Sequence, residues 1–197
     1  MAYCDWMRVA SHRSTLVSAV LLATLLSAAA LAGCAETPKP QPSASGTPDA
    51  APVFASDDEA LAAAEKAYAA YLAVESEVLG DGGKDAGRFS RVATGEALST
   101  AVEDAEGFED KGWRGDGKSL FKTHSIEAIE ISDSAVSISL YVCDDVGSVD
   151  VLDQTGASVV NPDGTSVTPW EVVLEGATGE PLLVSRKSFW TGGNFCE

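Results

Sequence analysis

The sequence predicts an α+β domain over residues 56–197, with helices first along the chain and an antiparallel sheet after them. Two observations predict this class. Apolar residues recur at helical spacing up to about residue 105, and from Phe121 onward they alternate with polar residues as in half-buried strands. A third observation is a series of turn signals that divides the second half into short segments. Because helices followed by strands are typical of α+β domains, the order of the patterns sets the class, and about 142 residues suffice for one domain.

The first helix is predicted to begin at Ser56, which forms a capping box with Glu59. Gly80, Gly82 and Gly83 are predicted to end it, because glycine favours the backbone conformation that stops a helix. Between these limits, the residues that recur at helical spacing are Leu61, Ala64, Tyr68, Leu72, Glu75 and Leu79.

A second helical region is predicted to follow. Phe89 and Val92 indicate a short helix, and a longer one is predicted to end between Gly107 and Gly112. The longer helix is indicated by the spacing of Ala97, Leu98, Ala101, Val102 and Ala105.

The sheet is predicted from Phe121 onward. A β-branched run covers residues 123–131, and aliphatic residues then alternate with others so that they share one face: Val136, Ile138, Leu140 and Val142. Turn signals follow at 132–133, 153–156, 161–164 and 176–179. They predict an antiparallel meander whose further strands cover 149–152, 158–160, 167–174 and 182–190.

The start of the chain has the organisation of an export signal. Arg8 and Arg13 precede an apolar run of about sixteen residues, which is shorter than a bilayer-spanning helix needs. Leu31-Ala32-Gly33-Cys34 closes the run and resembles the lipobox of bacterial lipoproteins. The resemblance implies that residues 1–33 are a removed signal peptide, with either Met1 or Met7 as the start, and that Cys34 is lipidated. An uncleaved membrane helix followed by an unrelated cysteine is the alternative.

Residues 34–55 are predicted to be the lipidated cysteine and a disordered tether, because prolines alternate there with small and polar residues. Removal of residues 1–33 leaves a formal net charge of about eighteen negative. Such a surface is repelled by nucleic acid and by anionic lipid. We therefore expect no nucleic-acid partner, and membrane attachment through the lipid anchor alone, on the extracytoplasmic face of the cell membrane.

The cysteine count predicts one disulfide. Cys4 belongs to the signal peptide and Cys34 carries the lipid, which leaves Cys143 and Cys196 for an oxidising compartment. A bridge between them would join the C-terminal tail to a central strand. A reactive thiol pair is the alternative, although the Cys-x-x-Cys spacing typical of such pairs is absent from the sequence.

Residues 112–119 match the phosphate-binding pattern G-x-x-x-x-G-K-S. A phosphate loop must follow a buried strand and open a helix, whereas here a helix precedes the match and a strand follows it. We therefore expect a glycine-rich turn. The Arg114-Gly115-Asp116 tripeptide inside it is expected to have no adhesive role.

The domain also resembles the nuclear-transport-factor-like, or SnoaL-like, cone fold, and small actinobacterial lipoproteins of unknown role look similar. The residues that carry the resemblance are Tyr68, Tyr71, the glycine turn 112–117, the segment Tyr141–Asp145 and Cys196. It implies N-terminal helices packed in a strongly curved antiparallel sheet. Related ketosteroid isomerases place an aspartate base and a hydrogen-bond donor in an apolar pocket. By that likeness Asp144 would face a pocket near Tyr68 or Tyr71, although Asp144 and Asp145 read equally well as a strand end.

Residues suited to catalysis or metal binding are few. His124 is the only histidine after residue 33, and the acidic pairs lack calcium-loop spacing, so no catalytic set, metal or cofactor is predicted. Aromatic residues could instead line a ligand pocket, although aromatic residues are more often core. The pocket candidates are Tyr68, Tyr71, Trp113 and Trp170.

Together these features predict a cell-envelope lipoprotein that presents a small, non-catalytic binding or interaction domain outside the cytoplasmic membrane. Its partner would be another envelope protein or a small apolar ligand. The alternative is a small cone-fold enzyme or carrier acting on an apolar small molecule. A domain interior filled by side chains would count against that alternative.

Overall fold

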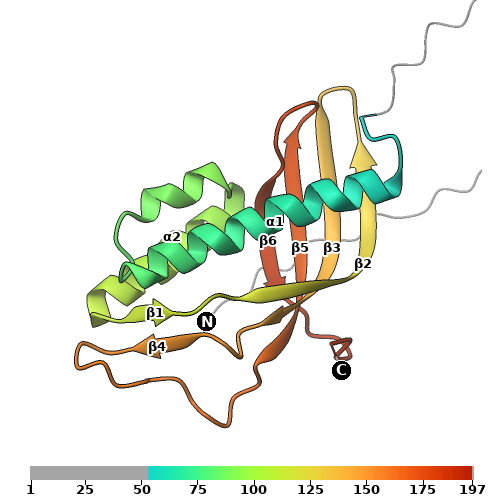
Figure 1. Cartoon of the computed structure of the whole chain (residues 1–197). Helices are drawn as coiled ribbons and strands as arrows, with labels where there is room; N and C mark the ends of the chain where they lie inside the picture. Colours follow the sequence, from blue (N-terminus) through green and yellow to red (C-terminus); the bar gives the residue numbers. More distant parts are fainter. Residues whose placement is uncertain (1–52, 197) are drawn as a thin grey trace, which may run out of the picture. The chain divides into compact units, whose positions relative to one another are not determined.

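The computed structural model describes residues 53–196, which belong to the second of two units in the chain, Pro48–Glu197. The predicted signal peptide, the lipidation of Cys34 and nearly all of the tether lie outside the described residues. Within them the protein contains three helices followed by six strands (Figure 1). None of these helices combines the length and apolar character needed to cross a membrane.

The helices begin and end where the sequence predicts. Helix α1 covers Asp57–Gly80; the Ser56 hydroxyl accepts the backbone N–H of Glu59, whose carboxylate accepts the backbone N–H of Ala55. A short 3₁₀ helix, η1, covers Ala86–Arg91, and α2 covers Gly95–Lys111. Helix α2 ends at Gly112, whose φ of 63° lies in the left-handed region that favours glycine.

Gly83 lets the two long helices approach each other after α1. Its φ is 80°, and a Cβ atom there would overlap the backbone carbonyl of Ala105 in α2. Both the backbone conformation and the close approach therefore require glycine at this position.

Four antiparallel strands form the main sheet, in the order β2-β3-β5-β6. Their bounds are Leu120–Ile131, Ala135–Asp145, Val167–Ala177 and Leu183–Phe189. Strands β1, Arg114–Asp116, and β4, Asp150–Leu152, pair with each other in a second, two-stranded sheet. The predicted meander is therefore interrupted: residues 149–152 leave the main sheet, and residues 158–160 form no strand beyond one bridge between Ser158 and Leu152.

The structure confirms an α+β domain with antiparallel sheets. The main sheet is not strongly curled, however, and the cone fold is not confirmed. Between β3 and β5, Asp150–Leu152 pairs with β1 in the two-stranded sheet and adds no further strand to the main sheet.

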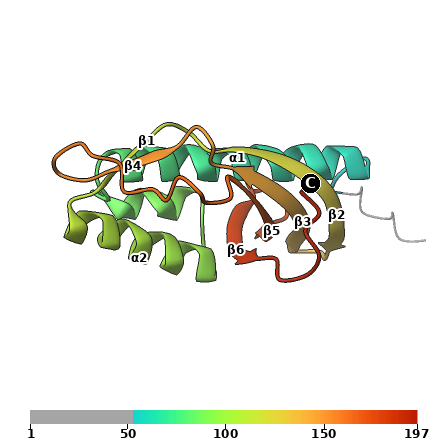
Figure 2. The ribbon, with the colours of Figure 1, turned by 90° about the horizontal axis from the view of Figure 1, so that it is seen from below.

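The core lies between one face of the main sheet and the helices. Helix α1 contacts β2 near one end and β1 near the other, and α2 lies beside β6 (Figure 2). The alternating aliphatic residues of β3 share one face, as predicted, and that face is buried in the core with Val172, Leu174 and Val184 from the neighbouring strands. Across from them α1 contributes Ala60, Ala64, Tyr68, Tyr71 and Leu72.

The two edges of the main sheet differ. At one edge, β6 bonds to residues 92–94: the Thr94 N–H donates to Val184 and the Val184 N–H donates to Val92. At the other edge, β2 pairs with β3 alone among the described strands, and its pairing shifts register twice, between Thr123 and Ser125 and between Ile126 and Ala128.

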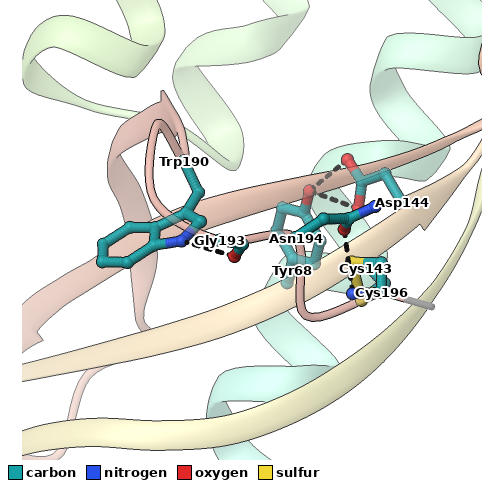
Figure 3. The surroundings of a disulfide bond; sticks show 7 residues. All are labelled: Tyr68, Cys143, Asp144, Trp190, Gly193, Asn194 and Cys196. Atoms are coloured by element: carbon teal, nitrogen blue, oxygen red, sulfur yellow. Dashed lines mark hydrogen bonds between the residues drawn. A yellow bond between two sulfur atoms is a disulfide. The ribbon is translucent and has the colours of Figure 1, made fainter.

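The C-terminal tail is bound to the face of the sheet away from the helices. Cys143 and Cys196 form the predicted disulfide (Figure 3). The Trp190 indole donates to the Gly193 carbonyl, and its ring packs against Tyr141. The tail thereby covers part of the second face of β3.

Candidate functional site

A half-buried lysine meets a buried aspartate and a buried tyrosine between α1 and the main sheet. The Tyr68 hydroxyl lies 2.8 Å and 2.7 Å from the two carboxylate oxygens of Asp144, and the Lys187 ammonium lies 2.8 Å from Asp144 Oδ2. The Asp144 side chain is 4% exposed and that of Lys187 14%. A carboxylate so deeply buried needs these partners, because an unpaired buried charge is strongly destabilising.

Each of these side chains is positioned by its element. Tyr68 is a core residue of α1, and Asp144 follows Val142 on the same face of β3 because alternate residues of a strand share a face. Figure 3 shows the Tyr68 hydroxyl directed at Asp144.

Lys187 reaches this face through a β-bulge in β6. Leu174 pairs with Val184 and the preceding Val173 with Arg186, so Ser185 is an extra residue without an opposite partner. The extra residue reverses the alternation, and Lys187 therefore shares the inner face with Val184. Sequence reasoning missed Lys187 because strict alternation from Val184 would place it outside.

Aromatic rings surround the Lys187 ammonium. It lies 4.7 Å from the centroid of the Trp170 ring and 5.7 Å from those of Tyr68 and Tyr71. These distances fall within the range of cation–π attraction, which favours a charged ammonium over the face of an aromatic ring.

A cavity of about 400 Å³ opens beside this group. Its charged lining residues are Glu75 of α1, Asp104 of α2, Asp144 and Lys187. Tyr71 and Trp170 contribute aromatic surface, and the remaining lining residues are Leu79, Ala97, Thr100, Ser119, Val146, Val149 and Thr168. The size suits a small organic molecule, and the lining combines apolar area with a few charged groups.

The ionisable groups around the cavity are perturbed mainly by burial. Burial, followed by the charge of Asp144, raises the pKa of Tyr68 well above its ordinary value. The pKa of Tyr71 is also raised, by burial and then by the charge of Glu75. Both hydroxyls therefore stay protonated and act as donors near neutral pH.

The two carboxyl groups at the cavity are also affected. Burial raises the pKa of Glu75, the charges of Asp144 and Asp104 raise it further, and Lys187 opposes them. Asp104 is an exposed residue, yet partial loss of hydration and then the charge of Glu103 raise the pKa of its carboxyl. The lining therefore contains three carboxyl groups, those of Glu75, Asp104 and Asp144, and one ammonium group, that of Lys187.

The structure brings three of the four predicted pocket residues together. Tyr71 and Trp170 line the cavity, and Tyr68 donates a hydrogen bond to Asp144, which is also in the lining. Trp113 lies apart from them, packed edge-on against Phe108 with the Lys111 ammonium over its ring.

The remaining motifs have structural surroundings. The 112–119 segment follows α2 and contains β1, so it is not a loop between a buried strand and a helix. The Arg114–Asp116 tripeptide is β1 itself. His124 lies in β2, where its ring stacks on Phe195. Within residues 53–196, no three histidine, cysteine, aspartate or glutamate side chains are grouped as a metal site would require.

Comparison with known proteins yields no family. No family model matches the chain, and no curated protein matches it. Among solved structures, it resembles the intermembrane space region of the chloroplast protein ARC6 with a TM-score of 0.46 and 13% identity, over 64% of this chain and 92% of that one. A protein from Catenulispora Acidiphila matches with a TM-score of 0.35 and 18% identity, over 65% and 91% of the two chains. Likenesses this weak carry no argument about function.

Proposed function

We propose that this protein is a cell-envelope lipoprotein whose domain binds a small organic ligand without chemically changing it. The observation that carries the proposal is the cavity of about 400 Å³ above the Tyr68–Asp144–Lys187 group. Helices, strands and the loop residues Ser119, Val146 and Val149 supply its lining, and a concave site with a few charged groups is typical of small-molecule binding.

The geometry of Asp144 favours binding over catalysis. A general base needs a carboxylate oxygen directed at the proton it removes. Here both oxygens accept from Tyr68, and Oδ2 also accepts from Lys187. The carboxylate therefore holds the lysine and tyrosine in place.

The alternative is a small cone-fold enzyme or carrier that acts on an apolar molecule. One observation favours it: Asp144 and Tyr71 both line the cavity, and the resemblance to ketosteroid isomerases implies an aspartate and a hydrogen-bond donor in such a pocket. The charged groups in the lining favour a polar or charged ligand over a wholly apolar one.

Localisation outside the cytoplasmic membrane, with a lipid on Cys34, is the second part of the proposal. The lipobox supports it, and so does the disulfide, because such bridges persist in oxidising compartments. Cell fractionation tests the anchor: Cys34→Ala is expected to leave the membrane fraction, whereas Cys4→Ala is expected to stay in it. Retention of Cys34→Ala in the membrane at the wild-type level would contradict lipidation.

A fragment screen tests ligand binding. The protein, held in lipid nanodiscs through its anchor, is titrated with a library of small organic compounds by calorimetry, with empty nanodiscs as the blank. Thr100→Trp places a large side chain at the rim of the cavity, whereas Ser99→Trp changes an exposed neighbour on α2 that is not part of the lining. We expect compounds that bind the wild type and Ser99→Trp but not Thr100→Trp. If Thr100→Trp weakens none of the compounds that bind, the cavity is not the ligand site.

A further inference from the structure

The charges of the cavity lining are unequal. Three carboxylates, those of Glu75, Asp104 and Asp144, face one ammonium, that of Lys187. Asp144 already forms an ion pair with Lys187. Within residues 53–196, neither Glu75 nor Asp104 takes part in an ion pair. Lys187 attracts both of these carboxylates, but its ion pair is with Asp144, so the acidic groups of the lining outnumber its one cation.

The wider charge of the protein acts in the same direction. The chain has a formal net charge of −17, which attracts cations and repels anions before any contact is made. The charges of Asp144 and Asp104 also raise the pKa of Glu75, so the negative charges are close enough to interact. A positive group placed between them would relieve that repulsion.

The surroundings of the Lys187 ammonium group indicate how an ammonium group can be bound in this cavity. Lys187 lies over Trp170 and against the Asp144 carboxylate, an aromatic face and an acid combined around one nitrogen. Other surface of the same kind lines the cavity, with Tyr71 on one turn of α1 and Glu75 on the next. A hydrated metal ion would gain little from these rings, whereas an organic cation gains from the rings and from the carboxylates.

We infer that the cavity binds a small organic cation, an ammonium group on an apolar body, with its charge between Glu75 and Asp104 and its body against Trp170. This inference rests on the proposed function, namely that the cavity is a ligand site. It adds the charge and the orientation of the ligand.

Three probes with one body and different heads test it: 2-phenylethylammonium, 2-phenylethanol and 3-phenylpropionate. Each is titrated by calorimetry into the protein in nanodiscs, with empty nanodiscs as the blank. We expect the cation to bind about tenfold or more tightly than the alcohol, and the carboxylate to bind most weakly, since a hydrogen bond to a charged group supplies at least that factor.

Two variants locate the charge. Glu75→Gln is expected to weaken binding of the cation about tenfold and to leave binding of the alcohol unchanged. Glu77→Gln is the matched control, because Glu77 lies on α1 but belongs to the exposed ion pair with Arg88. Glu77→Gln is expected to change the affinity for neither the cation nor the alcohol.

The possible results distinguish failure of the cation inference from failure of the proposed ligand-binding function. Equal or tighter binding of the alcohol or the carboxylate overturns the inference and leaves a ligand cavity. If Glu75→Gln lowers the affinity for the cation and for the alcohol equally, the inference is also overturned, because the contribution of Glu75 to binding would then not depend on its charge. If none of the three probes binds, the compounds found by the fragment screen decide: neutral or anionic compounds overturn the inference, and the absence of any cavity-dependent compound overturns the proposed function as well.

Discussion

Two neighbouring residues of β6 provide a controlled comparison of ion pairs. Lys187 lies 2.8 Å from Asp144 on the inner face, and Arg186 lies 2.7 Å from Glu171 on the outer face. The first pair is 14% and 4% exposed, and the second is 46% and 24% exposed. Geometry is thus nearly matched while burial differs, so replacement of each cation by methionine isolates the effect of burial.

We expect Lys187→Met to lower the free energy of unfolding by about 3 kcal/mol. Removal of one partner from a buried pair costs roughly 3–5 kcal/mol, because the remaining charge is left without compensation. The lower end applies here, since Asp144 keeps the hydrogen bond that the Tyr68 hydroxyl shares between its two carboxylate oxygens. Arg186→Met is expected to cost less than about 1 kcal/mol, as is typical of exposed pairs.

Urea unfolding followed by circular dichroism measures both changes, with thermal unfolding as a second readout. For a domain of this size, about 3 kcal/mol corresponds to a fall in Tm of roughly 10 °C, against about 3 °C or less for Arg186→Met. The double variant Asp144→Asn with Lys187→Met is expected to recover part of the loss, because the charge of Asp144 no longer remains without its partner. Equal midpoints for Lys187→Met and Arg186→Met would refute the argument from burial.

Three further predictions concern other parts of the domain. The pKa of Glu75 is raised in the folded state, so its ionised form opposes folding; Glu75→Gln is expected to raise Tm at pH 7, with the difference disappearing as the pH falls below the ordinary value of 4.5. A lower Tm for that variant at pH 7 would contradict this sign. Replacing Cys143 and Cys196 together by serine is expected to lower the free energy of unfolding by up to about 4 kcal/mol in urea titrations, because the bridge closes a loop with a sequence separation of 53. Thiol titration of the denatured wild type should find neither cysteine free. Gly83→Ala is expected to lower the free energy of unfolding by about 3 kcal/mol or more. Gly156→Ala is the control, because Gly156 has a similar φ of 82° but open space around it, and it is expected to lower that free energy by about 1 kcal/mol. Similar melting temperatures for the two variants would show that residue 83 does not lie tightly against α2.

Periodicity and capping predicted most of the fold. The capping box at Ser56, the glycines after α1 and the alternation in β3 are local signals, and each corresponds to the observed element. The segment 158–160 has the same kind of apolar signal but forms only a bridge. Whether an apolar segment becomes a strand depends on a partner elsewhere in the chain, which local periodicity does not specify.

The candidate site was predictable where alternation holds. Asp144 lies on the inner face as its spacing from Val142 indicates, and Tyr68 lies next to it. Lys187 could not be placed, because the bulge at Ser185 reverses the faces and has no clear mark in the sequence. Trp113 is an aromatic residue of the kind that lines ligand pockets, yet it lies in the turn after α2 and packs against Phe108 instead.

The two register shifts of β2 bear on how copies of this protein behave when crowded. A straight edge strand offers evenly spaced N–H and C=O groups, to which the edge of another molecule can add and extend the sheet. At β2 that spacing is broken twice within twelve residues, so a second copy could pair over only a few residues at a time. For a protein proposed to be confined to a membrane surface, where neighbours meet often, such an edge disfavours extension of the sheet from one copy to the next.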